Sequence, residues 1–148
     1  LGRSTVVHFA GHALPNASDP AQSTLPLAAD ADRVGLVRAS DIAAMDLTGT
    51  RTVVLSGCET GIGDDSGGGA PPSLSSAFLA AGVPAVVASL WPIADVPSAR
   101  LMTALHRRLR AGEEPAMALR SAQLELLRGT DPTLRSPDVW AAFQAFGS

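Results

Sequence analysis

The sequence lacks several features that mark particular classes of protein. It has one cysteine, Cys58, so no disulfide can form within the chain and nothing ties it to an oxidising compartment. The longest apolar stretches, such as residues 84–91, fall well short of the roughly 20 residues that a membrane-spanning helix requires. The N-terminal residues also lack the charged segment and apolar core of a signal peptide. We therefore expect a soluble, cytoplasmic protein with no membrane partner.

The sequence also lacks an excess of positive charge. Its formal net charge is -3, and no run of like charges occurs. This balance provides no basic face for phosphates and argues against a nucleic-acid partner. At 148 residues, 46% of them apolar, the chain can bury one hydrophobic core but is too short for two ordinary domains. It contains no internal repeat and no long linker, so we treat residues 1–148 as one folding unit.

Hydrophobic patterning predicts strands that alternate with helices. The runs at 5–9, 51–56 and 84–91 are apolar or β-branched and are typical of buried strands. Helices are expected over residues 40–47, 73–81, 99–110 and 115–127, with a last helix that begins at Pro137 and carries Trp140, Phe143 and Phe146. Such alternation predicts an α/β fold with a parallel sheet between layers of helices.

The same pattern predicts a set of core residues. Side chains from the strands should be buried, and side chains from flanking helices should cover the sheet. The expected strand residues are Val53, Val54, Leu55, Val86, Val87 and Leu90, and the expected helical residues are Phe78, Leu79, Leu101 and Leu105.

Two residues that can carry chemistry follow predicted strands. His12 comes just after the first strand and Cys58 just after the second. The carboxyl ends of parallel strands border ligand sites, and neighbouring strand ends lie about 5 Å apart. A lone cysteine is often a small buried apolar residue. Cys58, however, lies in a turn between Gly57 and Gly61, where a nearby imidazole could stabilise a nucleophilic thiolate.

The other two histidines have simpler interpretations. We expect His8 to be a strand residue inside the sheet and His106 to lie on a helix surface. His8 and His12 could instead be metal ligands, but the chain has neither the helical Glu of zinc peptidases nor a further Cys or His cluster. The sequence predicts no metal and no cofactor.

Several ordered blocks together resemble the CHAT family. They are His8-Phe9-Ala10-Gly11-His12, Val54-Leu55-Ser56-Gly57-Cys58-Glu59-Thr60-Gly61, Ala77-Phe78-Leu79-Ala80-Ala81-Gly82, Ser89-Leu90-Trp91-Pro92 and Trp140-Ala141-Ala142-Phe143. The resemblance implies a caspase-like three-layer sandwich with a mostly parallel sheet flanked by helices. It also implies that residues 1–148 are the C-terminal catalytic part of a larger domain or protein, with further N-terminal strands and an upstream tetratricopeptide-repeat region.

The resemblance assigns roles to particular residues. His12 is implied to be the general base and Cys58 the nucleophile of a Cys-His dyad. The family's first block usually ends in Gly, where this chain has Ala13. The backbone N–H groups of Ala13 and Cys58 can still stabilise an oxyanion, because an amide donor does not depend on its side chain.

From these roles we predict that the protein is a cysteine endopeptidase of caspase-like type, which cleaves a protein or peptide substrate. Gly57, Glu59, Asp64 and Asp65 are candidate substrate-binding residues. The paired acids could favour a basic side chain before the cleaved bond, although paired acids in a glycine-rich loop are more often merely solvated. We expect the loop 61–72 to be mobile without ligand. The alternative is a catalytically silent CHAT module that binds partner proteins as a regulator or scaffold.

Overall fold

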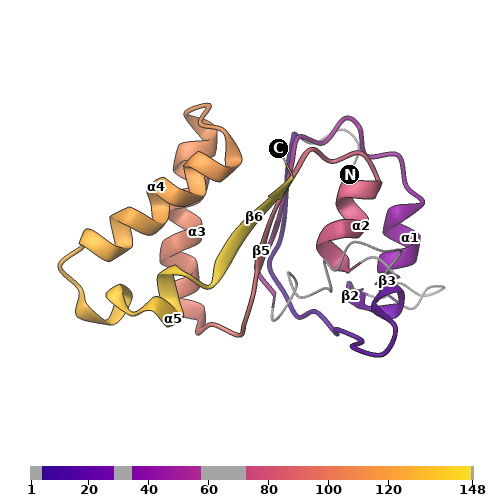
Figure 1. Ribbon diagram of the computed structural model, residues 1–148, viewed down its shortest axis with the longest axis horizontal. Coiled ribbons are helices and arrows are strands. Elements are labelled where there is room, and N and C mark those ends of the chain that lie inside the picture. Colours follow the sequence, from indigo (N-terminus) through magenta and orange to yellow (C-terminus); the bar gives the residue numbers. More distant parts are fainter. Residues whose placement is uncertain (1–4, 29–34, 58–72, 148) are drawn as a thin grey trace.

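The computed structural model describes residues 5–28, 35–57 and 73–147. At its centre is a four-stranded sheet of order β1-β4-β5-β6 (Figure 1). The strands are β1 (Val6–Phe9), β4 (Thr52–Leu55), β5 (Ala85–Ser89) and β6 (Phe143–Gly147). The first three run parallel, and β6 returns antiparallel to β5. A separate antiparallel pair consists of β2 (Thr24–Pro26) and β3 (Leu36–Arg38).

Helices cover both faces of the sheet. On one side lie α1 (Ala39–Ala43) and α2 (Leu74–Ala80), and on the other α3 (Asp95–Arg110), α4 (Pro115–Arg128) and the short α5 (Pro137–Trp140) (Figure 1). Two 3-10 turns, η1 (Pro20–Gln22) and η2 (Pro132–Arg135), complete the described structure. Proline in the first turn helps to start α4 and α5, because its missing N–H would have no partner inside a helix.

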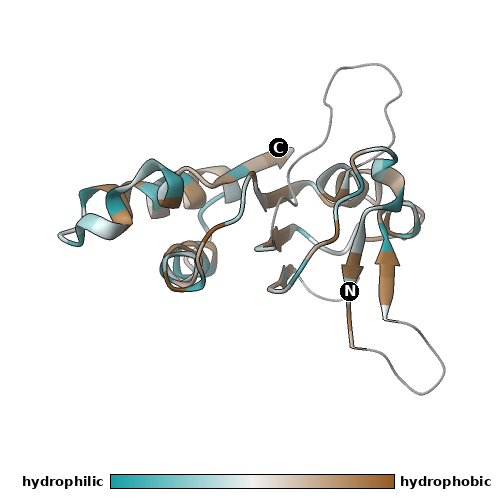
Figure 2. Ribbon diagram, turned by 90° about the horizontal axis from the view of Figure 1, so that it is seen from below, coloured by the Kyte–Doolittle hydropathy of each residue, from teal (hydrophilic) through white to brown (hydrophobic). Residues whose placement is uncertain are grey.

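The continuous apolar runs of β4 and β5 follow from this layering, because every residue of both strands is buried. Successive side chains point to opposite faces. Val53 and Leu55 therefore join the apolar cluster under α1 and α2, whereas Val54 joins the cluster under α3 and α4. Several strand arrows near the middle of the molecule are accordingly brown in Figure 2, the colour of hydrophobic residues.

The fold class expected from the sequence is confirmed: the protein is α/β, with a mostly parallel sheet flanked by helices, consistent with a caspase-like fold. The first two predicted strands are neighbours, since β1 pairs with β4 in parallel register. Eight of the ten predicted core residues are buried, whereas Leu79 and Leu90 are only partly buried. Leu90 also lies just beyond the end of β5, so it is not the strand residue that was expected.

The helix predicted from Pro137 onward is wrong beyond its first turn. The helix α5 ends at Trp140, and residues from Phe143 form β6. The aromatic spacing suggested a helix, but the segment lies beside β5 and its backbone pairs with that strand instead. Phe143 then packs toward α3 and α4, while Phe146 packs toward the opposite helical layer.

Among the described helices, none is both long and apolar enough to cross a membrane.

Candidate active site

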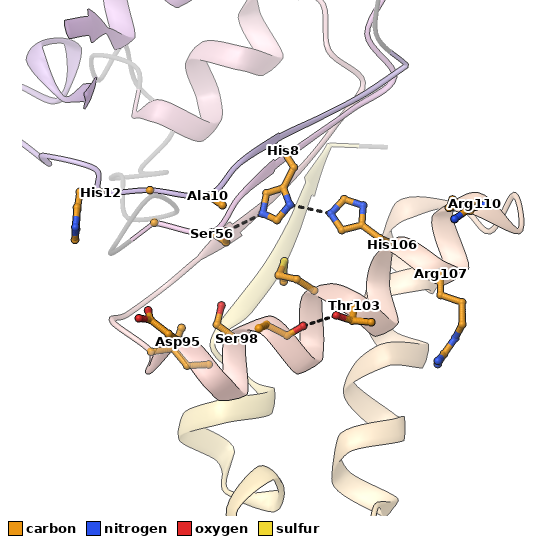
Figure 3. Close-up of a pocket in the computed structure, with 15 residues that line it drawn as sticks. His8, Ala10, His12, Ser56, Asp95, Ser98, Thr103, His106, Arg107 and Arg110 are labelled. Carbon is orange, nitrogen blue, oxygen red and sulfur yellow. Dashed lines mark hydrogen bonds between the residues drawn. The ribbon is translucent and has the colours of Figure 1, made fainter. Parts of the chain in front are cut away.

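The end of β1 and the end of β4 form one border of the site. Phe9 pairs with Leu55, and the N–H of Ser56 donates to the Phe9 carbonyl at 3.0 Å. The ends of the two strands are thereby held side by side. An open cleft of about 860 Å³ lies between this border and helix α3 (Figure 3).

The described residues expected to take part in the site lie at this border. His12 is exposed and lines the cleft, and Gly57, which follows β4, lines it too. Ala13, directly after His12, is 7% exposed, so its side chain packs into the core.

The remaining expected site residues, Cys58, Glu59, Asp64 and Asp65, lie outside the described residues, as does the loop 61–72.

Ser89 holds the segment that leads to Cys58. This buried serine ends β5, and its hydroxyl donates to the carbonyl oxygen of Gly57. The bond fixes the backbone one residue before Cys58 to the central sheet. Sequence reasoning missed this role, although a polar residue at the end of an otherwise apolar strand is a usable signal.

Three polar side chains meet in the middle of the cleft. The Nε2 atom of His8 lies 2.7 Å from Ser56 Oγ, and its Nδ1 atom lies 2.9 Å from Nε2 of His106 (Figure 3). The two imidazole rings are tilted by 32° with centroids 4.8 Å apart. His8 is a strand residue of β1 and His106 lies on the surface of α3, as expected, but no pattern in the sequence indicates that the two side chains meet. The side chain of His8 projects into the cleft toward α3 (Figure 3).

The comparison with known families matches the CHAT domain over residues 1–148. The chain belongs to the CHAT domain family. Among curated proteins, none matches it significantly. The CHAT domain is a caspase-like family related to cysteine peptidases, and the parallel pairing of β1 with β4 agrees with that relationship.

Partial desolvation in the cleft affects the pKa values of the histidine pair in this CHAT domain, in which His8 is exposed and His106 partly exposed. Desolvation lowers the pKa of His8 below its ordinary value, and the nearby positive charge of a protonated His106 lowers it further. Desolvation also lowers the pKa of His106. Both imidazoles are consequently neutral at neutral pH, in the state that can accept a proton.

Helix α3, which carries His106, is held against α4 by apolar packing and by ion pairs. Leu101 and Leu105 are fully buried in the cluster shared with α4. Arg107 bonds Glu125 at 2.5 Å, and Arg108 lies 3.4 Å from the same carboxylate. Exposed ion pairs contribute little to stability, so the apolar contacts determine where α3 lies.

Within the part of the chain that the structure describes, no three His, Cys, Asp or Glu side chains gather in a way that could hold a metal ion.

Proposed function

We propose that this CHAT domain is a cysteine endopeptidase that cleaves a protein or peptide substrate, with Cys58 as nucleophile and His12 as general base. The observation that carries the proposal is the parallel pairing of β1 with β4. His12 follows one strand and Cys58 follows the other, and parallel strands end at the same edge of a sheet. Membership of a family related to cysteine peptidases supports the same roles.

The proposed reaction needs no cofactor. His12 takes the proton of the Cys58 thiol, and the thiolate attacks the carbonyl carbon of the scissile peptide bond. The N–H groups of Ala13 and Cys58 stabilise the oxyanion, and His12 then protonates the leaving amine. Water hydrolyses the resulting thioester and regenerates the thiol.

Two features of the described residues suit this chemistry. The cleft beside His12 is open to solvent along α3, as a polypeptide substrate requires. The hydroxyl of Ser89 anchors Gly57, which restrains the backbone that presents the nucleophile. A restrained backbone keeps a reacting group close to its productive geometry, which contributes directly to rate.

The substrate-binding roles of Gly57, Glu59, Asp64 and Asp65 belong to the same proposal. Gly57 lines the cleft and leaves room for a substrate backbone. Asp64 and Asp65 follow Cys58 closely in the sequence and would favour a basic side chain before the cleaved bond. A positional-scanning peptide library, compared between the unmodified chain and Cys58→Ala, tests that preference.

The test of the dyad uses the fact that Cys58 is the sole cysteine, so any alkylation by iodoacetamide reports on this thiol alone. When the rate of alkylation is measured against pH, its midpoint gives the pKa of the Cys58 thiol. We expect this midpoint to lie well below about 8.5, the pKa of a free thiol. In His12→Ala the midpoint should rise toward that value, and cleavage of a peptide substrate should stop. Cys58→Ala should also abolish cleavage.

The matched control is Leu14→Ala, which changes an exposed side chain two residues from His12 and should leave the thiol titration unchanged. An ordinary thiol pKa in the unmodified chain, together with no turnover of any library peptide, would contradict the proposal. That result would favour a silent CHAT module that binds partner proteins. The test should be repeated on the parent protein, for which we propose that residues 1–148 form the catalytic part beside tetratricopeptide repeats.

A further inference from the structure

The contact between His8 and His106 joins parts of the chain that are 98 residues apart. His8 comes from β1, Ser56 directly follows β4, and His106 comes from α3. The three side chains form one continuous series of hydrogen bonds, from a hydroxyl to an imidazole and then to a second imidazole. A nucleophile, a base within hydrogen-bonding distance and a group that orients the base form the arrangement that activates hydroxyl nucleophiles.

The tautomers of the two histidines are an assignment from the hydrogen-bond network. The Ser56 hydroxyl has two acceptors within reach, His8 Nε2 at 2.7 Å and the Phe9 carbonyl at 3.4 Å. We assign its proton to the shorter contact, so that the hydroxyl donates to His8 Nε2. A neutral His8 then carries its proton on Nδ1 and donates it to Nε2 of His106. This tautomer leaves the Nε2 lone pair of His8 directed at the serine proton.

We propose that Ser56 is a second nucleophile of this domain, with His8 as its general base and His106 as the residue that orients His8. This proposal is independent of Cys58 and His12. The chemical class of substrate is a carboxylic ester with a small acyl group.

The chemistry balances without a co-reactant other than water. As Ser56 Oγ forms a bond to the ester carbonyl carbon, its proton passes to His8 Nε2. The bond to the leaving alkoxide then breaks, and His8 returns the proton to that oxygen. Water attacks the acyl-serine by the same route, releasing the carboxylic acid and restoring the hydroxyl. The neutral His106 accepts from His8 Nδ1 throughout and stabilises the imidazolium.

The surroundings suit a neutral base. Partial desolvation lowers the pKa of both imidazoles, which favours the neutral form of His8 that can accept a proton. The other titratable or charged groups that line the cleft are His12, Asp95, Arg107 and Arg110. In Figure 3, Arg107 and Arg110 extend away from the Ser56 hydroxyl, and Asp95 lies at the far end of α3.

The wall opposite Ser56 favours an apolar substrate group. Ile93, Ala99 and Met102 line the cleft on the α3 side, where they present aliphatic or thioether surface. Ser56 itself is partly exposed, so its oxygen can be reached. An ester with a short acyl chain would place its carbonyl at Ser56 and its chain against these side chains.

The experiment uses the full chain carrying Cys58→Ala, so that the proposed thiol nucleophile cannot contribute to the reaction with the probe. The probe is a biotinylated alkyl fluorophosphonate, which forms an Oγ–P bond and releases fluoride. Peptide mapping by mass spectrometry should locate the label on Ser56. Ser56→Ala should lose the label, and His8→Gln should slow labelling by about 100-fold, as is typical for removal of a general base. Ser40→Ala, at an exposed serine on α1, is the matched control and should react as before.

His106 is tested as a positioning residue by restoring its acceptor. His106→Leu should slow labelling, whereas His106→Glu, which can accept from His8 Nδ1, should recover the rate. The carboxylate should also move the pH profile of labelling upward, because a negative neighbour raises the pKa of His8. A role in packing alone would produce neither recovery nor shift.

Label on a different serine, or equal labelling after Ser56→Ala or His8→Gln, overturns the proposal. Peptide mapping of the Cys58→Ala chain needs no substitution in the cluster, so it decides the matter even where a cluster variant fails to fold. Since Cys58 is absent throughout, failure here leaves the proposed peptidase untouched, and failure of the peptidase leaves Ser56 untouched.

Discussion

Truncation of Leu55 to alanine tests whether the strand that leads to the candidate site is as rigid as its burial suggests. Leu55 is fully buried in the cluster that includes Val53, Leu74 and Phe78. The substitution removes the equivalent of three methylene groups, which costs about 2.4 kcal/mol at about 0.8 kcal/mol each. A remaining cavity of about 50 Å³ adds about 1.2 kcal/mol, at about 24 cal/mol per Å³. We therefore expect the free energy of unfolding to fall by about 3.6 kcal/mol.

Urea denaturation followed by circular dichroism measures this loss, provided that the slope of the transition is unchanged between variants. The matched control is Leu36→Ala on β3, where the side chain is 47% exposed, so the loss should stay below about 1.2 kcal/mol. If Leu55→Ala costs less than about 1.5 kcal/mol, or no more than Leu36→Ala, the packing around β4 is looser than the burial implies.

Two further predictions concern stability. Gly82 and Gly112 both have positive φ, 95° and 87°, so alanine at either should cost about 1 kcal/mol in backbone strain. Of these two positions, the new Cβ would meet a neighbour too closely at Gly82, where Thr48 Cγ2 is 2.8 Å away. Gly82→Ala should therefore lower the free energy of unfolding, measured in urea, more than Gly112→Ala does. Equal losses would contradict this. Folding also lowers the pKa of His8 and of His106 from 6.5, so the unfolded chain binds more protons and the free energy of unfolding should fall as the pH drops through 6.5. Replacing both histidines by glutamine should flatten that pH region, and an already flat profile in the unmodified chain would refute the linkage.

The parts of the fold that could be predicted from the sequence are those that depend on local residue patterns. The apolar runs of β4 and β5 are long enough to identify them as buried strands, and Pro115 marks the start of α4 correctly. The strand β6 could not be identified in this way. Its aromatic residues suit a helix as well as a strand, and only its pairing with β5, distant in sequence, decides between them.

The candidate site likewise has features that local sequence patterns predict and features that they do not. The position of His12 at the sheet edge could be predicted, because it requires only that the residue follow a strand. The meeting of His8 with His106 depends on how α3 packs across the sheet, which no local pattern encodes. The bond from Ser89 to Gly57 likewise depends on the order of strands and on the length of β5.

The sheet order has a consequence for how the two strands that border the site can separate. Within the described residues, β4 is paired on both sides, whereas β1 is paired only with β4. Alternate residues of β1 are exposed, but every residue of β4 is buried. Regions with few buried contacts open locally at a free energy below that of global unfolding. In this part of the chain, the strand that carries His8 should therefore open at a lower free energy than β4, and amide exchange of β1 should be faster than that of β4.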